Sequence, residues 1–221
     1  MDVAKRYLSI LENDIHSVVC ATTDDHGRPV TRVIDIMLSD GDTFYFLTAS
    51  GKDFYHQLMS TGYIALTGMS GGEGMDREHA TMDRKSISVR GSVECIGTDK
   101  LDEIFTRNPY MAEIYPSEES REALVVFRMT AGRGEFFDLS TRPITREAFS
   151  VGDQGHLEDG NLGRKPYIIT ADCIGCGKCL TTCPQDCISS ETVPFRIDQR
   201  HCLHCGNCFN DCPVGAVVRR Y

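Results

Sequence analysis

The sequence contains no tryptophan, no run of more than two consecutive basic residues and no long uninterrupted apolar segment. Without a run of about 20 apolar residues no membrane-spanning helix is expected, and the first residues lack the apolar core of a signal peptide. The net charge of −9 and the missing basic runs argue against a nucleic acid or an anionic membrane as the main partner. We therefore expect a cytoplasmic protein without a nucleic-acid or membrane partner.

Composition and charge divide the chain into two parts. Of its 221 residues, 41% are hydrophobic and 25% are charged, which is enough for a buried core and allows one large domain or two small ones. Residues 166–221 carry five acidic and five basic groups, so the whole net charge of −9 belongs to residues 1–165. Nine of the 11 cysteines lie between Cys173 and Cys212, within the segment 166–221 that has no net charge.

The cysteines form a repeated C-x2-C-x2-C-x3-C-P pattern, in which a shift of 29 residues maps Cys173 onto Cys202 and Cys183 onto Cys212. This is the spacing of bacterial two-cluster ferredoxins, in which the fourth cysteine of each run ligates the other [4Fe–4S] cluster. We assign one cluster to Cys173, Cys176, Cys179 and Cys212, and the other to Cys183, Cys202, Cys205 and Cys208. Residues 167–221 thus resemble a bacterial ferredoxin over essentially their whole length.

Zinc and disulfide bonds are the competing interpretations of the cysteines. A zinc ribbon has no use for a third evenly spaced cysteine, and a disulfide framework requires an oxidising compartment. Cys187 falls outside the repeat and corresponds to Ala216, so we expect it to fill a small buried position, with a ligand role as the less favoured alternative.

Residues 1–140 are predicted to form a mainly β module. Amphipathic and alternating patterns predict helices over 2–13, 52–60 and 98–113 (the last broken at Pro109) and strands over 15–23, 30–38, 43–48, 63–69, 85–96, 123–130 and 134–139. A glycine-rich polar loop is expected at 70–83, and 141–166 is expected to be a linker or an extended arm. Short strands with small helices indicate a closed or partly closed barrel, so the class is α+β and mainly β.

The amino-acid sequence of several segments resembles that of the pyridoxamine 5′-phosphate oxidase-like family of FMN-binding split β-barrels. The matching segments are His16–Thr23, Gly27-Arg28-Pro29, Thr31-Arg32-Val33-Ile34, Phe44-Tyr45-Phe46-Leu47-Thr48, Ser50-Gly51-Lys52, Gln57-Leu58, Ile64-Ala65-Leu66 and Val89-Arg90-Gly91. The resemblance divides the chain into a flavin-binding split barrel (1–140), a linker or arm (141–166) and a two-cluster [4Fe–4S] domain (167–221), and it implies a homodimer.

The resemblance also implies which residues hold FMN. Arg32 and Lys52 would bind the phosphate with Thr48 and Ser50 as hydroxyl donors, Val33, Ile34 and Asp35 would face the isoalloxazine edge, and Leu47 and Gln57 complete the set. Arg32 lies on an otherwise apolar strand face and needs an anion, because an unpaired buried guanidinium is costly. The competing interpretation pairs Arg32 with Asp35 or Glu94 and leaves Lys52 in solvent.

Two departures from the family limit the functional inference. The chain has nothing like the C-terminal segment with which true pyridoxamine-phosphate oxidases bind FMN and substrate, so oxidation of vitamin B6 is not expected. The family also includes members that bind haem or a deazaflavin. For haem, the axial ligand would come from His16, His26, His56 or His79.

We expect an oxidoreductase in which two [4Fe–4S] clusters and FMN connect a one-electron carrier to a two-electron small-molecule substrate, with either direction of electron flow. The alternatives are a non-enzymatic electron-transfer or redox-sensing protein that acts on a partner protein, and a haem-binding split barrel. No residue stands out in the sequence as a general acid, so no catalytic residue is assigned.

Overall fold

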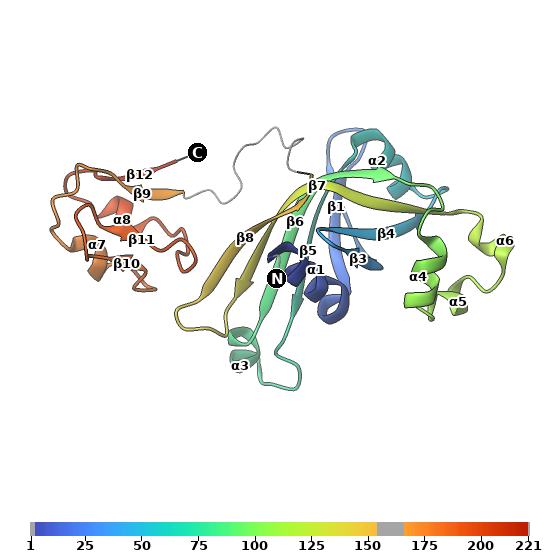
Figure 1. The fold of residues 1–221 in the computed structure, drawn as a ribbon, viewed down its shortest axis with the longest axis horizontal. Coiled ribbons are helices and arrows are strands. Elements are labelled where there is room, and N and C mark those ends of the chain that lie inside the picture. The colour runs from blue at the N-terminus through green and yellow to red at the C-terminus, as the bar shows by residue number, and fades with distance from the viewer. Residues whose placement is uncertain (1–2, 154–165, 221) are drawn as a thin grey trace. The chain divides into compact units, whose positions relative to one another are not determined.

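The computed structural model describes residues 3–153 and 166–220, which form two compact units (Figure 1). The first unit consists of the described residues within 1–70, 86–135 and 149–160, and the second of those within 71–85, 136–148 and 161–221. No helix in the described part of the chain is long and apolar enough to cross a membrane.

An eight-stranded sheet forms the body of the fold. Its strands are β1 (Ser17–Thr23), β2 (Pro29–Asp35), β3 (Leu38–Asp40), β4 (Thr43–Ala49), β5 (Tyr63–Ser70), β6 (Lys85–Cys95), β7 (Leu124–Asp138) and β8 (Thr145–Gly152). The order is β2-β1-β5-β6-β7-β4-β3, and β8 pairs with β7. The sheet curls into an antiparallel half-barrel, which confirms the split-barrel class (Figure 1).

Short helices precede and connect these strands. They are α1 (Val3–Ile10), the π-helical turn η1 (Leu11–Ile15), α2 (Asp53–Thr61), α3 (Arg77–Met82), α4 (Leu101–Arg107), α5 (Met111–Ile114) and α6 (Glu118–Arg121). The expected break at Pro109 is confirmed, because it lies between α4 and α5. The residue cannot donate a backbone hydrogen bond, which ends the preceding helix.

An aromatic core fixes β4 against β7. Phe46 pairs in register with Phe127, and their ring centres lie 5.6 Å apart in a stacked arrangement. Phe54 of α2 also stacks on Phe46, with ring centres 6.0 Å apart. Since Phe46 is fully buried and Phe54 is 6% exposed, this stack anchors the N-terminal half of α2 on the sheet.

Four details of the expected secondary structure need correction. The predicted strand 30–38 is divided between β2 and β3, and the two predicted strands at 123–139 are one continuous strand, β7. The glycine-rich loop contains α3, whose N-cap Asp76 accepts hydrogen bonds from two backbone N–H groups. Residues 145–152 of the expected linker form β8; the rest of that segment, 154–165, lies outside the described residues.

Residues 166–220 of the second unit contain two similar halves. The elements of this part are β9 (Tyr167–Ile169), α7 (Lys178–Thr181), β10 (Ile188–Ser189), β11 (Arg196–Ile197), α8 (Asn207–Asn210) and β12 (Val217–Arg219). A shift of 29 residues places α7 on α8, as the sequence repeat predicts. The outer strands β9 and β12 pair with each other, and so do the inner strands β10 and β11. Each pair joins one strand from each half, which gives the two halves an approximate two-fold relationship.

Candidate cofactor sites

One cavity of the second unit is lined by four cysteines from both halves. Cys173 and Cys176 come from the loop that leads into α7, Cys179 lies in α7, and Cys212 comes from the second half. Apolar side chains complete the wall, among them Ile169, Ile174, Phe195, Val214 and Val217. The residues assigned to the first cluster therefore surround one space.

A second cavity repeats this arrangement. Cys202 and Cys205 come from the loop that leads into α8, Cys208 lies in α8, and Cys183 comes from the first half. Gly177 and Gly206 precede the two short helices with φ of 76° and 82°, a left-handed conformation that glycine adopts without strain. Each cavity thus collects three thiols from one loop and one from the other half, as expected for two cubane clusters. Ligation itself stays a prediction.

The protonation of these thiols bears on how a cluster would bind. Burial raises the pKa of Cys208 to about 11 and also raises that of Cys179. A hydrogen bond with Cys187 lowers the pKa of Cys202. Because a thiolate is the ligand of iron, the thiols with raised pKa must release their protons when metal binds.

Cys187 lies beside the second cavity. Its side chain is buried, and its Sγ atom is 3.5 Å from the Sγ of Cys183. Its counterpart in the repeat, Ala216, lines the first cavity in the same way. Burial agrees with the expected packing role, and the contact with Cys183 adds a weak S–H donor that sequence reasoning did not anticipate.

The interpretation that paired Arg32 with a carboxylate is wrong for the described residues. The Nη1 atom of Arg32 donates to Thr22 Oγ1 at 2.6 Å, and Nη2 donates to Gln57 Oε1 at 2.8 Å. Asp35 accepts instead from Ser17 and Tyr110, and Glu94 pairs with Arg128. The half-buried guanidinium of Arg32 is therefore oriented by neutral groups, and none of the described carboxylates forms an ion pair with it. That arrangement fits an anionic ligand such as a phosphate.

The other predicted phosphate-binding residues lie at the beginning of α2. Lys52 is the exposed N-cap residue, and its side chain forms no capping bond. Ser50 is exposed and its backbone N–H donates to Ala123. Thr48 is only 4% exposed, which makes its hydroxyl a poor donor to a ligand without local movement. The contact of Arg32 with Gln57, a residue of α2, joins this helix to β2.

The predicted ring-binding segment lies on an edge of the sheet. β2 is the terminal strand and pairs only with β1 within the described sheet. Val33 is exposed, whereas Ile34 and Asp35 are partly buried, and Leu47 on β4 is partly buried as well. Backbone groups on the outer edge of β2 are therefore available to a planar polar ligand.

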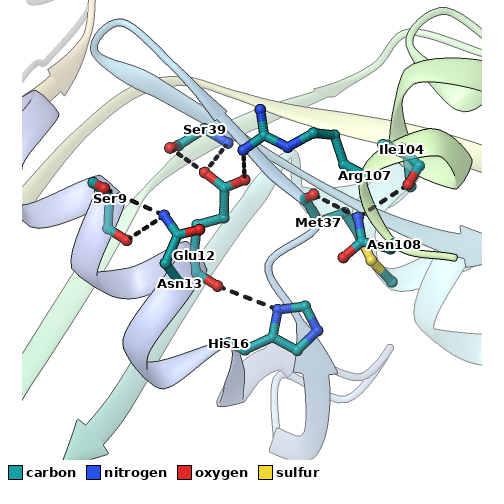
Figure 2. A network of polar contacts seen from close by, with 9 residues as sticks. All are labelled: Ser9, Glu12, Asn13, His16, Met37, Ser39, Ile104, Arg107 and Asn108. Carbon is teal, nitrogen blue, oxygen red and sulfur yellow. Dashed lines mark hydrogen bonds and ion pairs between the residues drawn. The ribbon is translucent and has the colours of Figure 1, made fainter. Parts of the chain in front are cut away.

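Sequence reasoning missed a polar cluster at the end of β2. Figure 2 shows His16 at the end of η1, with Nδ1 contacting the backbone oxygen of Glu12 at 3.3 Å. The other ring nitrogen of His16 lies 2.9 Å from the hydroxyl of Tyr110, which also contacts Asp35. Tyr110 is 94 residues from His16 and 75 from Asp35, so no local sequence pattern could reveal the cluster.

The remaining histidines proposed as axial ligands have ordinary surroundings. His79 bonds to Asp76 at 2.6 Å on α3, and His56 is exposed on α2 with its ring edge toward Tyr55. His26 is exposed in the β1–β2 turn. Among the described residues, no three His, Cys, Asp or Glu side chains are arranged to hold a single metal ion.

Comparison with known proteins identifies both parts of the chain. The profile of the family described as pyridoxamine 5′-phosphate oxidase matches residues 5–138, and that described as a 4Fe-4S dicluster domain matches residues 172–216. One subunit of the ion-translocating oxidoreductase complex from Alcanivorax borkumensis is 44% identical over 43 residues, which are 20% of this chain and 22% of that protein. The chain therefore spans only about a fifth of this relative.

Two solved structures have a similar fold. A NimC/NimA family protein from Clostridium acetobutylicum is 14% identical, with a TM-score of 0.52 over 68% of this chain and 95% of that one. A heme binding protein from Mycobacterium smegmatis is 12% identical, with a TM-score of 0.52 over 68% of this chain and 59% of that one. At these identities the similarity concerns the fold alone.

Proposed function

The chain belongs to the pyridoxamine 5′-phosphate oxidase family, and on that premise we propose that it is an oxidoreductase that uses FMN and two [4Fe–4S] clusters. The family domain is followed by a 4Fe-4S dicluster domain, a combination that supports electron transfer. The substrate side of the proposal is a small molecule or a redox partner protein. We further propose a cytoplasmic homodimer.

The observation that carries this proposal is the pair of cysteine cavities. Each is lined by four cysteines of the repeated motif, three from one half and one from the other. Iron–sulfur clusters exchange single electrons whereas a flavin exchanges one or two, so the two cofactors together would connect a one-electron carrier to a two-electron substrate. Electron flow in either direction is consistent with the residues present.

The barrel residues have separate tasks in this proposal. Arg32, oriented by Thr22 and Gln57, would bind the FMN phosphate together with Lys52 and the first backbone N–H groups of α2. The outer edge of β2 from Val33 to Asp35 would bind the polar edge of the ring. Oxidation of pyridoxamine phosphate is not proposed, because the chain continues into the cysteine module in place of the segment that such oxidases use.

The proposal is tested by the absorbance spectrum of anaerobically purified protein, measured again on the supernatant after acid precipitation. We expect a broad brown absorbance that acid destroys and a yellow flavin spectrum that remains in solution. In the Arg32→Ala, Lys52→Ala double variant the supernatant should lose most of its flavin while the iron content stays unchanged. The matched control is Lys5→Ala, Arg28→Ala, which removes the same charge from exposed positions and should keep its flavin.

Other outcomes would redirect the assignment. Brown protein with a colourless supernatant would overturn FMN as a retained cofactor and leave an electron carrier or redox sensor. A Soret band, lost in one of the histidine variants His16→Ala, His26→Ala, His56→Ala or His79→Ala, would favour a haem-binding barrel. That candidate is favoured by the similar fold of the heme binding protein from M. smegmatis.

A further inference from the structure

Three titratable side chains from separate elements meet at the end of β2. His16 follows η1, Asp35 is the last residue of β2, and Tyr110 lies in the turn between α4 and α5. The Tyr110 hydroxyl is 2.9 Å from Nε2 of His16 and 3.0 Å from Oδ2 of Asp35. The side chains of His16 and Asp35 are 32% and 30% exposed, so the cluster is open to a small molecule.

The hydrogen bonds determine where the protons can be. The partner of His16 Nδ1 is a backbone carbonyl, which only accepts, so Nδ1 carries a proton. When the imidazole is neutral, Nε2 has a lone pair and competes with Asp35 for the Tyr110 proton. When it is an imidazolium, Nε2–H donates to Tyr110 Oη while the Tyr110 hydroxyl donates to Asp35. The three groups thus form a chain along which one proton can move from His16 through Tyr110.

His16 is held in a strained backbone conformation. Its φ of 58° and ψ of −66° lie outside the common regions for a residue with a side chain. Its N–H donates to Leu11 at 2.9 Å, closing the π-helical turn, and its carbonyl accepts from Ile36 at 2.8 Å. Strain of this kind, and single π-helical turns, concentrate at functional sites.

A partly buried polar network connects the elements around the cluster (Figure 2). The carboxylate of Glu12 is bound by Arg107 at 2.7 Å and by the backbone and hydroxyl of Ser39. The amide of Asn108 donates to the carbonyls of Met37 and Ile104. These contacts connect η1, β3 and α4. They therefore position His16, which follows η1, and Tyr110, which follows α4.

We propose that His16 and Tyr110 form a proton-delivery site for a substrate whose reducible group ends in an oxygen atom, such as a quinone, with Asp35 as the positioning residue. This inference rests on the proposed function, which puts the flavin ring edge at Val33–Asp35. Tyr110 is the group that touches the substrate oxygen, and His16 is the source of the proton. Asp35 remains a carboxylate and holds the Tyr110 hydroxyl in place.

The proton transfer balances with the electrons that the proposed function supplies. Reduction of a quinone to a quinol takes up two electrons and two protons, of which the reduced flavin provides two electrons and one proton. For the second proton, the Tyr110 hydroxyl turns from Asp35 to the substrate oxygen, and its O–H bond breaks as an O–H bond forms on the substrate. Nε2–H of His16 passes its proton to Tyr110 Oη, and the restored hydroxyl donates to Asp35 again. Neutral His16 then regains a proton from solvent.

The raised pKa of Tyr110 requires that these two transfers occur together. Burial and the neighbouring Asp35 carboxylate raise the pKa of Tyr110 well above its ordinary value, so a free phenolate is unfavourable. A concerted relay avoids it. The other charged groups on η1, β2, β3, α4 and α5 are Glu12, Asp14, Arg32, Asp40, Asp102, Glu103, Arg107 and Glu113. Of these, Glu12 and Arg107 form an ion pair with each other.

The test compares His16→Asn and Tyr110→Phe with the wild type and with His56→Asn. Asparagine keeps a planar polar side chain at residue 16 but cannot deliver a proton, and His56 is an exposed histidine of α2 that serves as the matched control. Photochemically reduced protein is mixed anaerobically with limiting menadione, and quinol formation is followed by stopped-flow absorbance between about pH 5.5 and 9, a range that spans the ordinary histidine pKa. Flavin content and thermal unfolding are measured in parallel.

We expect both variants to keep their flavin and to form quinol about tenfold or more slowly than the wild type. The wild-type rate should fall as rising pH deprotonates a histidine, and His16→Asn should lose this dependence. Wild-type rates and pH profiles in both variants would overturn the inference while leaving the proposed function in place. Wild-type protein without flavin would overturn the proposed function itself. If Tyr110→Phe does not fold, His16→Asn alone decides between these outcomes.

Discussion

The guanidinium carbon of Arg32 lies 4.4 Å from the centre of the Phe54 ring, so an arginine of β2 rests on an aromatic side chain of α2. The same guanidinium donates to Thr22 and Gln57. Stacking and two directed hydrogen bonds fix both the plane and the rotation of the group, a combination that lysine cannot reproduce. The charge of Arg32 is thereby preorganised without being neutralised.

Arg32→Lys should therefore weaken FMN binding although the charge is kept. The lysine ammonium lacks the planar, forked donors of the guanidinium, so about one charge-assisted hydrogen bond is lost. We expect the dissociation constant of FMN to rise about tenfold. It is measured by titrating flavin-free protein with FMN and following the quenching of flavin fluorescence. Arg28→Lys, in the exposed turn before β2, is the control and should bind like the wild type. Equal affinities of all three proteins would contradict a phosphate role for Arg32.

Cys187→Ala should retain both clusters. Residue 187 corresponds to Ala216 in the other half, so the structure already accommodates alanine at the equivalent position. Cys183→Ala, by contrast, removes one of the four repeat-motif cysteines that line the second cavity and should lower the iron content by about half. Iron and acid-labile sulfide are determined on anaerobically purified protein. Loss of iron from Cys187→Ala, with none from Cys183→Ala, would show that Cys187 is the iron ligand and that Cys183 is not.

Gly91→Ala should strongly destabilise the barrel. A Cβ atom at residue 91 would overlap the carbonyl oxygen of Ala131 and lie 2.5 Å from the Cα of Gly132, and both are backbone atoms that cannot move aside. We expect a loss of about 3 kcal/mol in the free energy of unfolding, visible as a lower Tm by circular dichroism. Gly51→Ala is the control, because a Cβ atom there meets nothing within 4 Å. An unchanged Tm for Gly91→Ala would show that the backbones of β6 and β7 can move apart at this position at little cost in free energy.

The buried thiol of Cys20 should make the protein less stable at alkaline pH. Burial raises its pKa from 9.0 to about 11, although nearby Arg32 partly opposes the shift. The unfolded thiol ionises near pH 9 and the folded one only near pH 11, so between these values the folded state holds a proton that the unfolded state has lost. The corresponding stability is fully present below pH 9 and is lost as the pH rises toward 11. Across this range the wild type should lose about 2 kcal/mol more than Cys20→Ala, measured by urea unfolding.

The matched control for this measurement is Cys95→Ala, since Cys95 is less buried than Cys20. It should follow the pH dependence of the wild type. A Cys20→Ala variant with the same alkaline loss as the wild type would mean that the thiol at residue 20 does not control this part of the pH profile.

The cysteine sets and the architecture of the second unit follow from local sequence. Ligand spacing in this module is a local property: the chain between Cys173 and Cys179 is too short to place these residues far apart. The shift of 29 residues also predicted the symmetry, because similar sequences in the two halves fold into similar elements, here α7 and α8. Alternating patterns likewise predicted most strands of the barrel, since the side-chain period of a strand is local.

Which side chains meet across the barrel depends on tertiary packing. The partners of Arg32 depend on how α2 packs on the sheet, which gives it Thr22 and Gln57 and not the carboxylates of the competing interpretation. Strand β8 lacked a periodic signal and forms because β7 offers it an edge. The meeting of His16, Asp35 and Tyr110 depends on contacts across 75 and 94 residues. Such contacts are set by sheet register and helix packing, which no local pattern of residues encodes.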